Sequence, residues 1–201
     1  MPWSDDARVM VRPFRAYAAL AATPDDRPAR TAVARAAFFL FVCGVFVSLV
    51  TAGRLVAFHL VSTMAFWSFI PAVQAAAFLV ALRVAGGRPG WGALSMYFAG
   101  HGPWMALFMA LAGMCLFTPD PYAAFMALVR SGALLGMLVA VIAWSGVLTY
   151  ACYRVGVGLG RRRAAAATAL FYLGFAAVIV GYYLAMNEIQ PQLPWAQRTW
   201  T

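Results

Sequence analysis

Long runs without any charged side chain are the feature that most limits how this 201-residue chain can fold. Five runs contain no Asp, Glu, Lys or Arg, and they cover residues 36–53, 55–82, 89–119, 131–153 and 164–187. A helix crosses about 30 Å of hydrocarbon with about 20 apolar residues. Each run can therefore hold one membrane span, with arginines at its ends reaching toward the interface.

Helices explain these runs better than a barrel does. A backbone in lipid must satisfy its own hydrogen bonds, which leaves α-helices or closed β-barrels. Barrel strands alternate polar and apolar residues, whereas these runs are apolar throughout. Charged residues make up 10% of the chain, against about 25% in soluble domains. We therefore predict an all-α, polytopic transmembrane bundle of five spans.

Breaker residues and charges set the expected boundaries. The predicted spans cover about residues 33–57, 63–84, 103–118, 124–154 and 164–186. Pro71 is expected to kink the second span, and residues 91–98 to form a short interfacial helix before the third. The chain then divides into a cytoplasmic amphipathic arm over residues 1–31, the transmembrane domain over 32–187 and an extracytoplasmic tail over 188–201.

The arginines predict the orientation of the bundle. All 15 basic residues are arginines, and cytoplasmic loops carry the excess of positive charge in membrane proteins. With five spans, one side receives twelve of them, namely Arg8, Arg12, Arg15, Arg27, Arg30, Arg35, Arg83, Arg88, Arg154, Arg161, Arg162 and Arg163. The other side receives Arg54, Arg130 and Arg198. This split predicts a cytoplasmic N-terminus and a C-terminus outside. Because topology explains the arginines, we expect no nucleic-acid partner.

Candidate chemistry is sparse. His59 and His101, the only histidines, are expected near opposite membrane surfaces, so they do not predict a haem pair. The three cysteines lie in predicted spans without CxxC spacing. Gln74 is the clearest polar side chain inside a span, and no Asp or Glu lies within one, which argues against an ion-coupled carrier. We expect no enzyme activity, no catalytic residues, no metal and no cofactor.

The sequence contains more residue patterns typical of helix packing and surface contact than patterns typical of catalysis. Gly132 with Gly136, and Ala177 with Gly181, are small residues four apart, a spacing that lets membrane helices approach closely. A second set of arginines and aromatic residues is expected to contact lipid headgroups or a partner. It consists of Arg12, Phe14, Arg15, Tyr17, Arg161, Arg162, Arg163, Trp195 and Trp200. The lipid bilayer and other membrane proteins are the expected partners.

Three segments resemble a known family. They are RPFRAYAALAATPDDRPAR, VAGGRPGWGALSMYFAGHGPWMALF and AVIAWSGVLTYACYRVGVGLGRRRAAA. Together with the five-span pattern over residues 15–187, they resemble the bacterial branch of the Yip family, the Ypt/Rab-interacting membrane proteins. The acidic-tyrosine-glycine-proline motif of the eukaryotic members is missing, so Rab binding does not carry over.

The resemblance implies a non-enzymatic scaffold, or a binding partner for other membrane components, in a bacterial inner membrane. The alternative is an accessory subunit of a large bacterial membrane complex of the respiratory, photosynthetic or secretion type.

Overall fold

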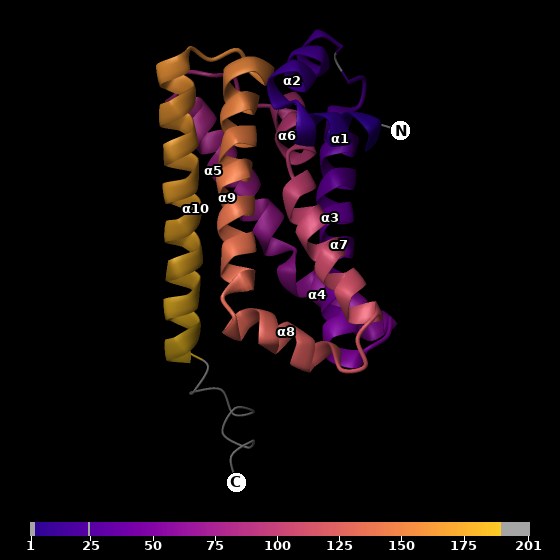
Figure 1. Cartoon of the computed structure of the whole chain (residues 1–201). Helices are drawn as coiled ribbons and strands as arrows, with labels where there is room; N and C mark the ends of the chain where they lie inside the picture. Colours follow the sequence, from indigo (N-terminus) through magenta and orange to yellow (C-terminus); the bar gives the residue numbers. More distant parts are fainter. Residues whose placement is uncertain (1–2, 24, 190–201) are drawn as a thin grey trace.

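The fold is a bundle of long helices with shorter ones at both ends (Figure 1). The computed structural model describes residues 3–23 and 25–189, with side-chain surroundings described between residues 5 and 185. Every regular element within these residues is a helix, which confirms the predicted all-α class. The elements are α1 (Trp3–Val11), α2 (Pro13–Ala22), α3 (Pro28–Ala52), α4 (Ala57–Trp67), α5 (Phe69–Val84), α6 (Trp91–Ala99), α7 (Gly102–Leu116), α8 (Pro121–Arg130), α9 (Ala133–Ala151), the π-helix η1 (Cys152–Gly156) and α10 (Arg161–Ile189).

Four stretches of helix are long and apolar enough to cross a membrane. They are Pro28–Ala52, Ala57–Val84, Ala133–Gly156 and Arg161–Ala185. Helices α6 and α7 meet at 40° and raise the number to five if they form one span. The prediction of a polytopic helical bundle is thus confirmed at four or five helices of sufficient length.

Proline and glycine explain two of the helix ends. Helix α3 has Pro28 in its first turn and ends at Gly53, whose φ of 63° suits glycine. The first long helix therefore lies a few residues nearer the N-terminus than the predicted span at 33–57. Between α4 and α5 the helix breaks at Ser68, three residues before Pro71. Pro71 has no N–H for the Trp67 carbonyl, and its ring crowds the preceding turn, which accounts for the expected kink.

The predicted fourth span, at residues 124–154, is wrong at its start. Residues 121–130 form the separate helix α8, which lies across the end of the bundle (Figure 1). The Asp120 carboxylate caps α8 by accepting a hydrogen bond from the Ala123 N–H at 2.9 Å. The chain then turns at Gly132, whose φ of 73° favours glycine, and α9 begins. The span-length helix covers residues 133–156.

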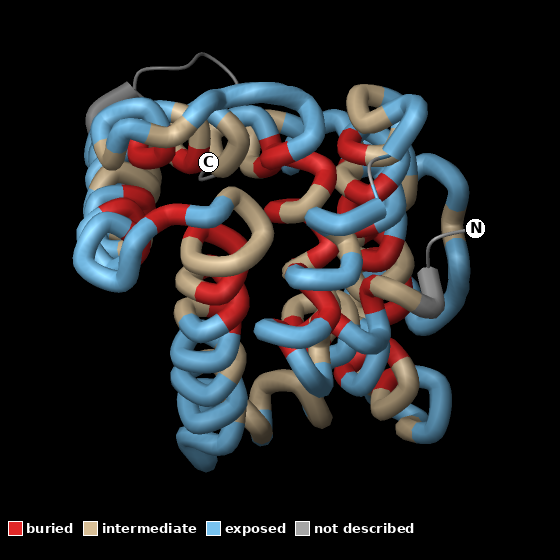
Figure 2. The backbone as a smooth tube through the Cα atoms, turned by 90° about the horizontal axis from the view of Figure 1, so that it is seen from above, coloured by how far each residue is buried: buried red, intermediate tan, exposed pale blue. Residues whose placement is uncertain are grey.

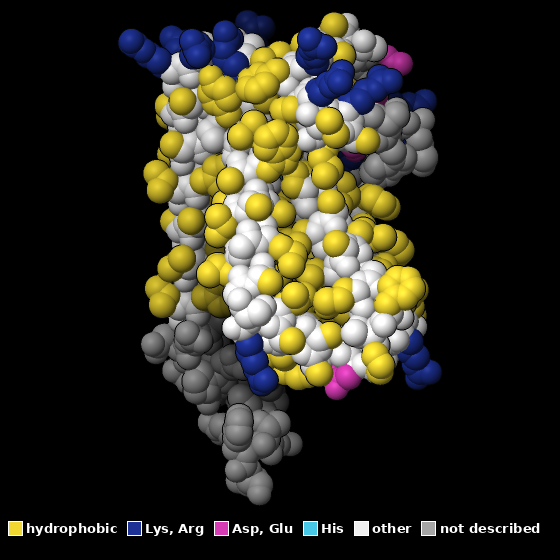
Figure 3. All heavy atoms as spheres, viewed as in Figure 1, with side chains coloured by type: hydrophobic (Ala, Val, Ile, Leu, Met, Phe, Trp, Pro, Cys, Tyr) yellow, Lys and Arg dark blue, Asp and Glu magenta, His cyan; other side chains and the backbone are white. Residues whose placement is uncertain are grey.

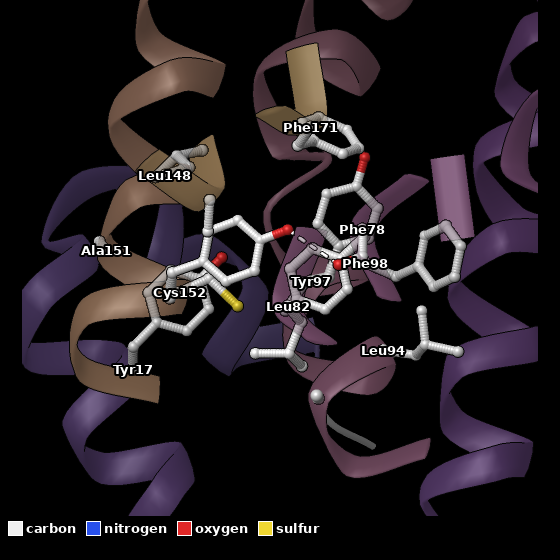
Figure 4. Close-up of a cluster of buried hydrophobic side chains, with 14 of the residues drawn as sticks. Tyr17, Phe78, Leu82, Leu94, Tyr97, Phe98, Leu148, Ala151, Cys152 and Phe171 are labelled. Atoms are coloured by element: carbon white, nitrogen blue, oxygen red, sulfur yellow. Dashed lines mark hydrogen bonds between the residues drawn. The ribbon is translucent and has the colours of Figure 1, made fainter. Parts of the chain in front are cut away.

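Most of the core lies at the end of the bundle where α1, α2, α6 and η1 meet the long helices. Phe78 of α5 is stacked between Tyr97 and Tyr153, with both centroid distances 4.6 Å. Phe78 and Tyr97 are labelled among the core side chains in Figure 4. A view down on the bundle shows the buried positions where its helices face one another (Figure 2). A smaller cluster, formed by Leu49, Ala112 and Cys115, joins α3 to α7.

Helix α6 differs from expectation in its surroundings. The sequence predicts a short interfacial helix at residues 91–98, and a helix does occupy Trp91–Ala99. However, Leu94, Tyr97 and Phe98 are each about 5% exposed because α6 is packed into the main core. Only its first two residues, Trp91 and Gly92, are exposed. Helix α6 is therefore a core element and not a surface helix.

Candidate functional site

The N-terminal arm, formed by α1 and α2, is docked on the bundle. Val9 and Tyr17 are fully buried, and Trp144 of α9 donates from Nε1 to the Met10 carbonyl at 3.0 Å. Burial raises the pKa of Tyr17 well above its ordinary value, so its hydroxyl stays protonated. Tyr17 was expected to contact a partner or headgroups, but its ring belongs to the chain's own core. The arm is a structural part of the bundle.

A buried ion pair fastens the arm to the first long helix. Arg35 donates from Nε to Asp6 Oδ2 at 3.0 Å and from Nη2 to Asp6 Oδ1 at 2.5 Å. Its Nη1 donates to the carbonyl and the hydroxyl of Ser95, at 2.7 and 3.0 Å. All three residues are buried. Burial raises the pKa of the Asp6 carboxyl, and the Arg35 guanidinium offsets part of that rise.

Sequence reasoning missed this network. It counted Arg35 among the twelve arginines expected at the cytoplasmic surface, although the side chain is 6% exposed. The available signal was an arginine about two turns inside a long apolar helix, together with acids in the arm. A charge so placed needs a buried partner, but the sequence offered several acids and no means to choose among them.

The other arginines of the described residues gather at the two ends of the bundle, most of them at the arm end (Figure 3). The predicted contact residues Arg12, Phe14 and Arg15 are exposed on α2, and Arg161, Arg162 and Arg163 are exposed at the start of α10. The structure therefore brings these two groups to one end of the molecule. Trp195 and Trp200 lie outside the described residues.

The predicted packing residues are not buried against another described helix. Gly132, Gly136, Ala177 and Gly181 are all exposed. A Cβ added at any of the three glycines would meet no atom within 4 Å. Gly132 also lies in the turn before α9, so only Gly136 of that pair is helical.

These positions belong to a larger surface, which we call the open flank and define as residues 133–144 of α9 and 173–185 of α10. None of its residues is buried. It carries strongly exposed apolar side chains, including Leu135 at 65% and Leu173 at 70%. Nearer the arm end, the same helices bury Leu148 and Phe171 in the main core. Each helix is thus buried along one half and exposed or half-exposed along the other, where Tyr182 contacts Phe69 of α5 and Trp144 bonds to the arm.

The two histidines occupy separate surroundings. His59 Nδ1 lies 2.9 Å from Thr51 Oγ1, whereas His101 is buried between α6 and α7 with its Nε2 3.0 Å from Gln74 Oε1. His101 also lines a cavity of about 50 Å³, and so does Ser145. The Nδ1 of His101 and the hydroxyl of Ser145 have no hydrogen-bond partner among the described residues. No group of three or more metal-ligating side chains occurs within the described part of the chain.

No protein-family model, curated protein or solved structure matches this chain. Its class therefore rests on the fold. The chain is an all-helical protein with four or five helices able to cross a membrane.

Proposed function

We propose that this chain is a non-enzymatic, multi-pass membrane protein that holds other membrane proteins against its open flank. The supporting observation is the uneven packing of the long helices. In the most apolar stretch of α3, 39% of the residues are buried inside the chain. The corresponding share is 17% in α9 and 17% in α10. Helix α3 is therefore the central helix, and α9 and α10 form the side of the bundle that is least buried within the chain.

Small residues make this side suitable for a helical partner. Gly136, Ala140 and Ala143 recur three or four residues apart on one face of α9, and Ala177 and Gly181 do so on α10. Where side chains are small, two helix backbones approach closely and gain van der Waals contact, which drives association in lipid. An exposed stripe of this kind on a helix otherwise lined by Leu, Val and Ile favours protein contact over lipid alone.

The proposed orientation has the arm end in the cytoplasm and the α8 end outside, in a bacterial inner membrane. The support is the crowding of arginines at the arm end, with Arg54 and Arg130 near the other end. Neutralisation of Arg35 by Asp6 removes one charge from the predicted count and leaves the asymmetry in place. The resemblance to the Yip family stays a prediction.

The test adds bulk to the open flank. Gly136→Leu should block close approach of a partner helix, so proteins that co-purify with the full chain in mild detergent should be lost. Val80→Trp is the control, because it adds bulk to an exposed position of α5, outside the open flank. Both variants should match the parent in expression and thermal unfolding. If Gly136→Leu retains every partner, the flank faces lipid and the proposal is wrong.

A further inference from the structure

An open hollow of about 580 Å³ lies at the arm end, between α2, the end of α9, η1 and the start of α10. We call it the arginine hollow. It is lined by Phe14, Tyr150, Arg154, Val155, Gly158 and Arg161. The proposed partner-binding flank is at the other end of α9 and α10, so this hollow is a separate feature.

The walls of the arginine hollow are built by the local fold. The rings of Phe14 and Tyr150 meet edge to face, with centroids 6.3 Å apart. Gly156 of η1 faces α6 and α2, and a Cβ there would lie 3.2 Å from Sδ of Met96 and 3.5 Å from Cδ1 of Tyr17. The π-helical turn η1 interrupts the end of α9, and such turns are frequent at functional sites.

The same turn positions one of the two arginines. Arg154 of η1 donates from Nη1 to the Leu159 carbonyl at 3.0 Å, which holds its guanidinium beside the hollow and leaves its other N–H groups available. Arg161 begins α10 and is exposed. The chain reverses between them at Gly158, whose φ of 80° suits glycine.

No carboxylate neutralises this charge. Among the described residues, the ion pairs join Arg8 to Asp5 and Arg35 to Asp6, and neither Arg154 nor Arg161 takes part in one. A second open hollow, lined by Arg12, Pro13, Phe14 and Arg15, shares Phe14 with the first. The arginine hollow is therefore a positively charged surface with an aromatic wall and an unneutralised pair of guanidinium groups.

We propose that the arginine hollow binds the headgroup of an anionic phospholipid. The phosphate would accept hydrogen bonds from Arg154 and Arg161, since guanidinium groups match phosphate oxygens in charge and geometry. The glycerol and the first methylenes of the acyl chains would lie against Phe14 and Tyr150. The hollow sits at the ends of helices able to span a membrane, which is where headgroups lie.

The aromatic wall decides the source of the phosphate. A free phosphate ion would use the two arginines and gain nothing from Phe14, which is 45% exposed. A phospholipid uses both, because its phosphate is joined to an apolar body. The inference is therefore a lipid site and not a general anion site.

The test compares two neighbouring arginines. Arg161→Gln removes a lining charge, whereas Arg162→Gln removes an equal charge from an exposed residue that does not line the hollow. The full chain in mild detergent is titrated with phosphatidylglycerol, and bound lipid is counted by native mass spectrometry. We expect Arg161→Gln to bind this lipid about fivefold more weakly. Arg162→Gln should stay within about twofold of the parent, since Arg162 does not line the hollow and its charge is screened by solvent.

Three further measurements complete the test. Phosphatidylcholine with the same acyl chains should bind more weakly to the parent chain and respond equally little to both substitutions. Phe14→Ala should weaken phosphatidylglycerol binding while lowering the unfolding temperature only slightly, because Phe14 is half-exposed. Excess inorganic phosphate should not displace the lipid. The proposal would be overturned by any one of four results. These are equal losses of affinity from Arg161→Gln and Arg162→Gln, equal affinity for both lipids, no effect of Phe14→Ala on lipid binding, and displacement of the lipid by phosphate.

Discussion

Asp6 of α1 and Arg35 of α3 form a two-point ion pair with both residues about 95% buried. Arg35 uses its remaining inner N–H groups on Ser95 of α6. One guanidinium thereby ties together three helices that are far apart in the sequence. The polar groups at this junction depend on one another, because all three residues are buried.

Asp6→Ala should destabilise the chain by about 3–5 kcal/mol, since it leaves the Arg35 charge buried without a partner. Thermal unfolding in detergent, followed by intrinsic fluorescence, measures the change. Asp5→Ala is the matched control: Asp5 makes only an exposed contact with Arg8, at 3.7 Å, and its loss should cost less than about 1 kcal/mol. Equal effects of the two substitutions would contradict a special role for Asp6.

Gly100→Ala should destabilise the docking of the arm. A Cβ at this position would lie 2.8 Å from the Tyr17 hydroxyl oxygen and 3.1 Å from the Tyr97 carbonyl oxygen. Both neighbours are buried, so relief requires a shift of α2 or α6 and should cost about 1–3 kcal/mol. Gly92→Ala serves as the control, because a Cβ there meets nothing within 4 Å and alanine favours the helix. Faster proteolysis of the arm in Gly100→Ala would provide a second readout.

Tyr153→Phe should cost about 1 kcal/mol of unfolding free energy. Its hydroxyl donates to the Phe78 carbonyl at 3.0 Å, and phenylalanine preserves the ring stack while removing this bond. Tyr150→Phe removes a hydroxyl that forms no hydrogen bond with another described residue, so its cost should stay below about 0.5 kcal/mol. If the two variants unfold at the same temperature, the Tyr153 bond contributes nothing.

Cysteine labelling should place the two ends of the bundle on opposite sides of the membrane. In a chain with its three native cysteines changed to alanine, Tyr122→Cys in α8 should react with an impermeant maleimide from outside intact cells. Arg162→Cys should react only after the membrane is opened. Both positions are exposed in the fold. Reaction of Arg162→Cys in intact cells would show that the orientation is reversed.

Features that depend on residues close together in the sequence were predictable. The long apolar runs predicted the long helices, because hydropathy and helix length are properties of a single segment. Pro71 predicted a break near its own position for the same reason. Residues 121–130 were misassigned, because Gly132 in an apolar sequence gave no sign that the chain would turn there.

The sequence by itself determined that this is a helical protein of the membrane-spanning class, since a charge-poor chain with apolar runs of span length can satisfy its backbone in lipid only by forming helices. The tertiary structure alone decided which polar residues are buried together. Asp6 and Arg35 are 29 positions apart, and Arg35 and Ser95 are 60 apart. It likewise decided that Tyr17 is buried in the core and that Gly136 is exposed. Burial depends on which helices pack side by side, and that packing is set by contacts between distant segments and not by the composition of a single segment.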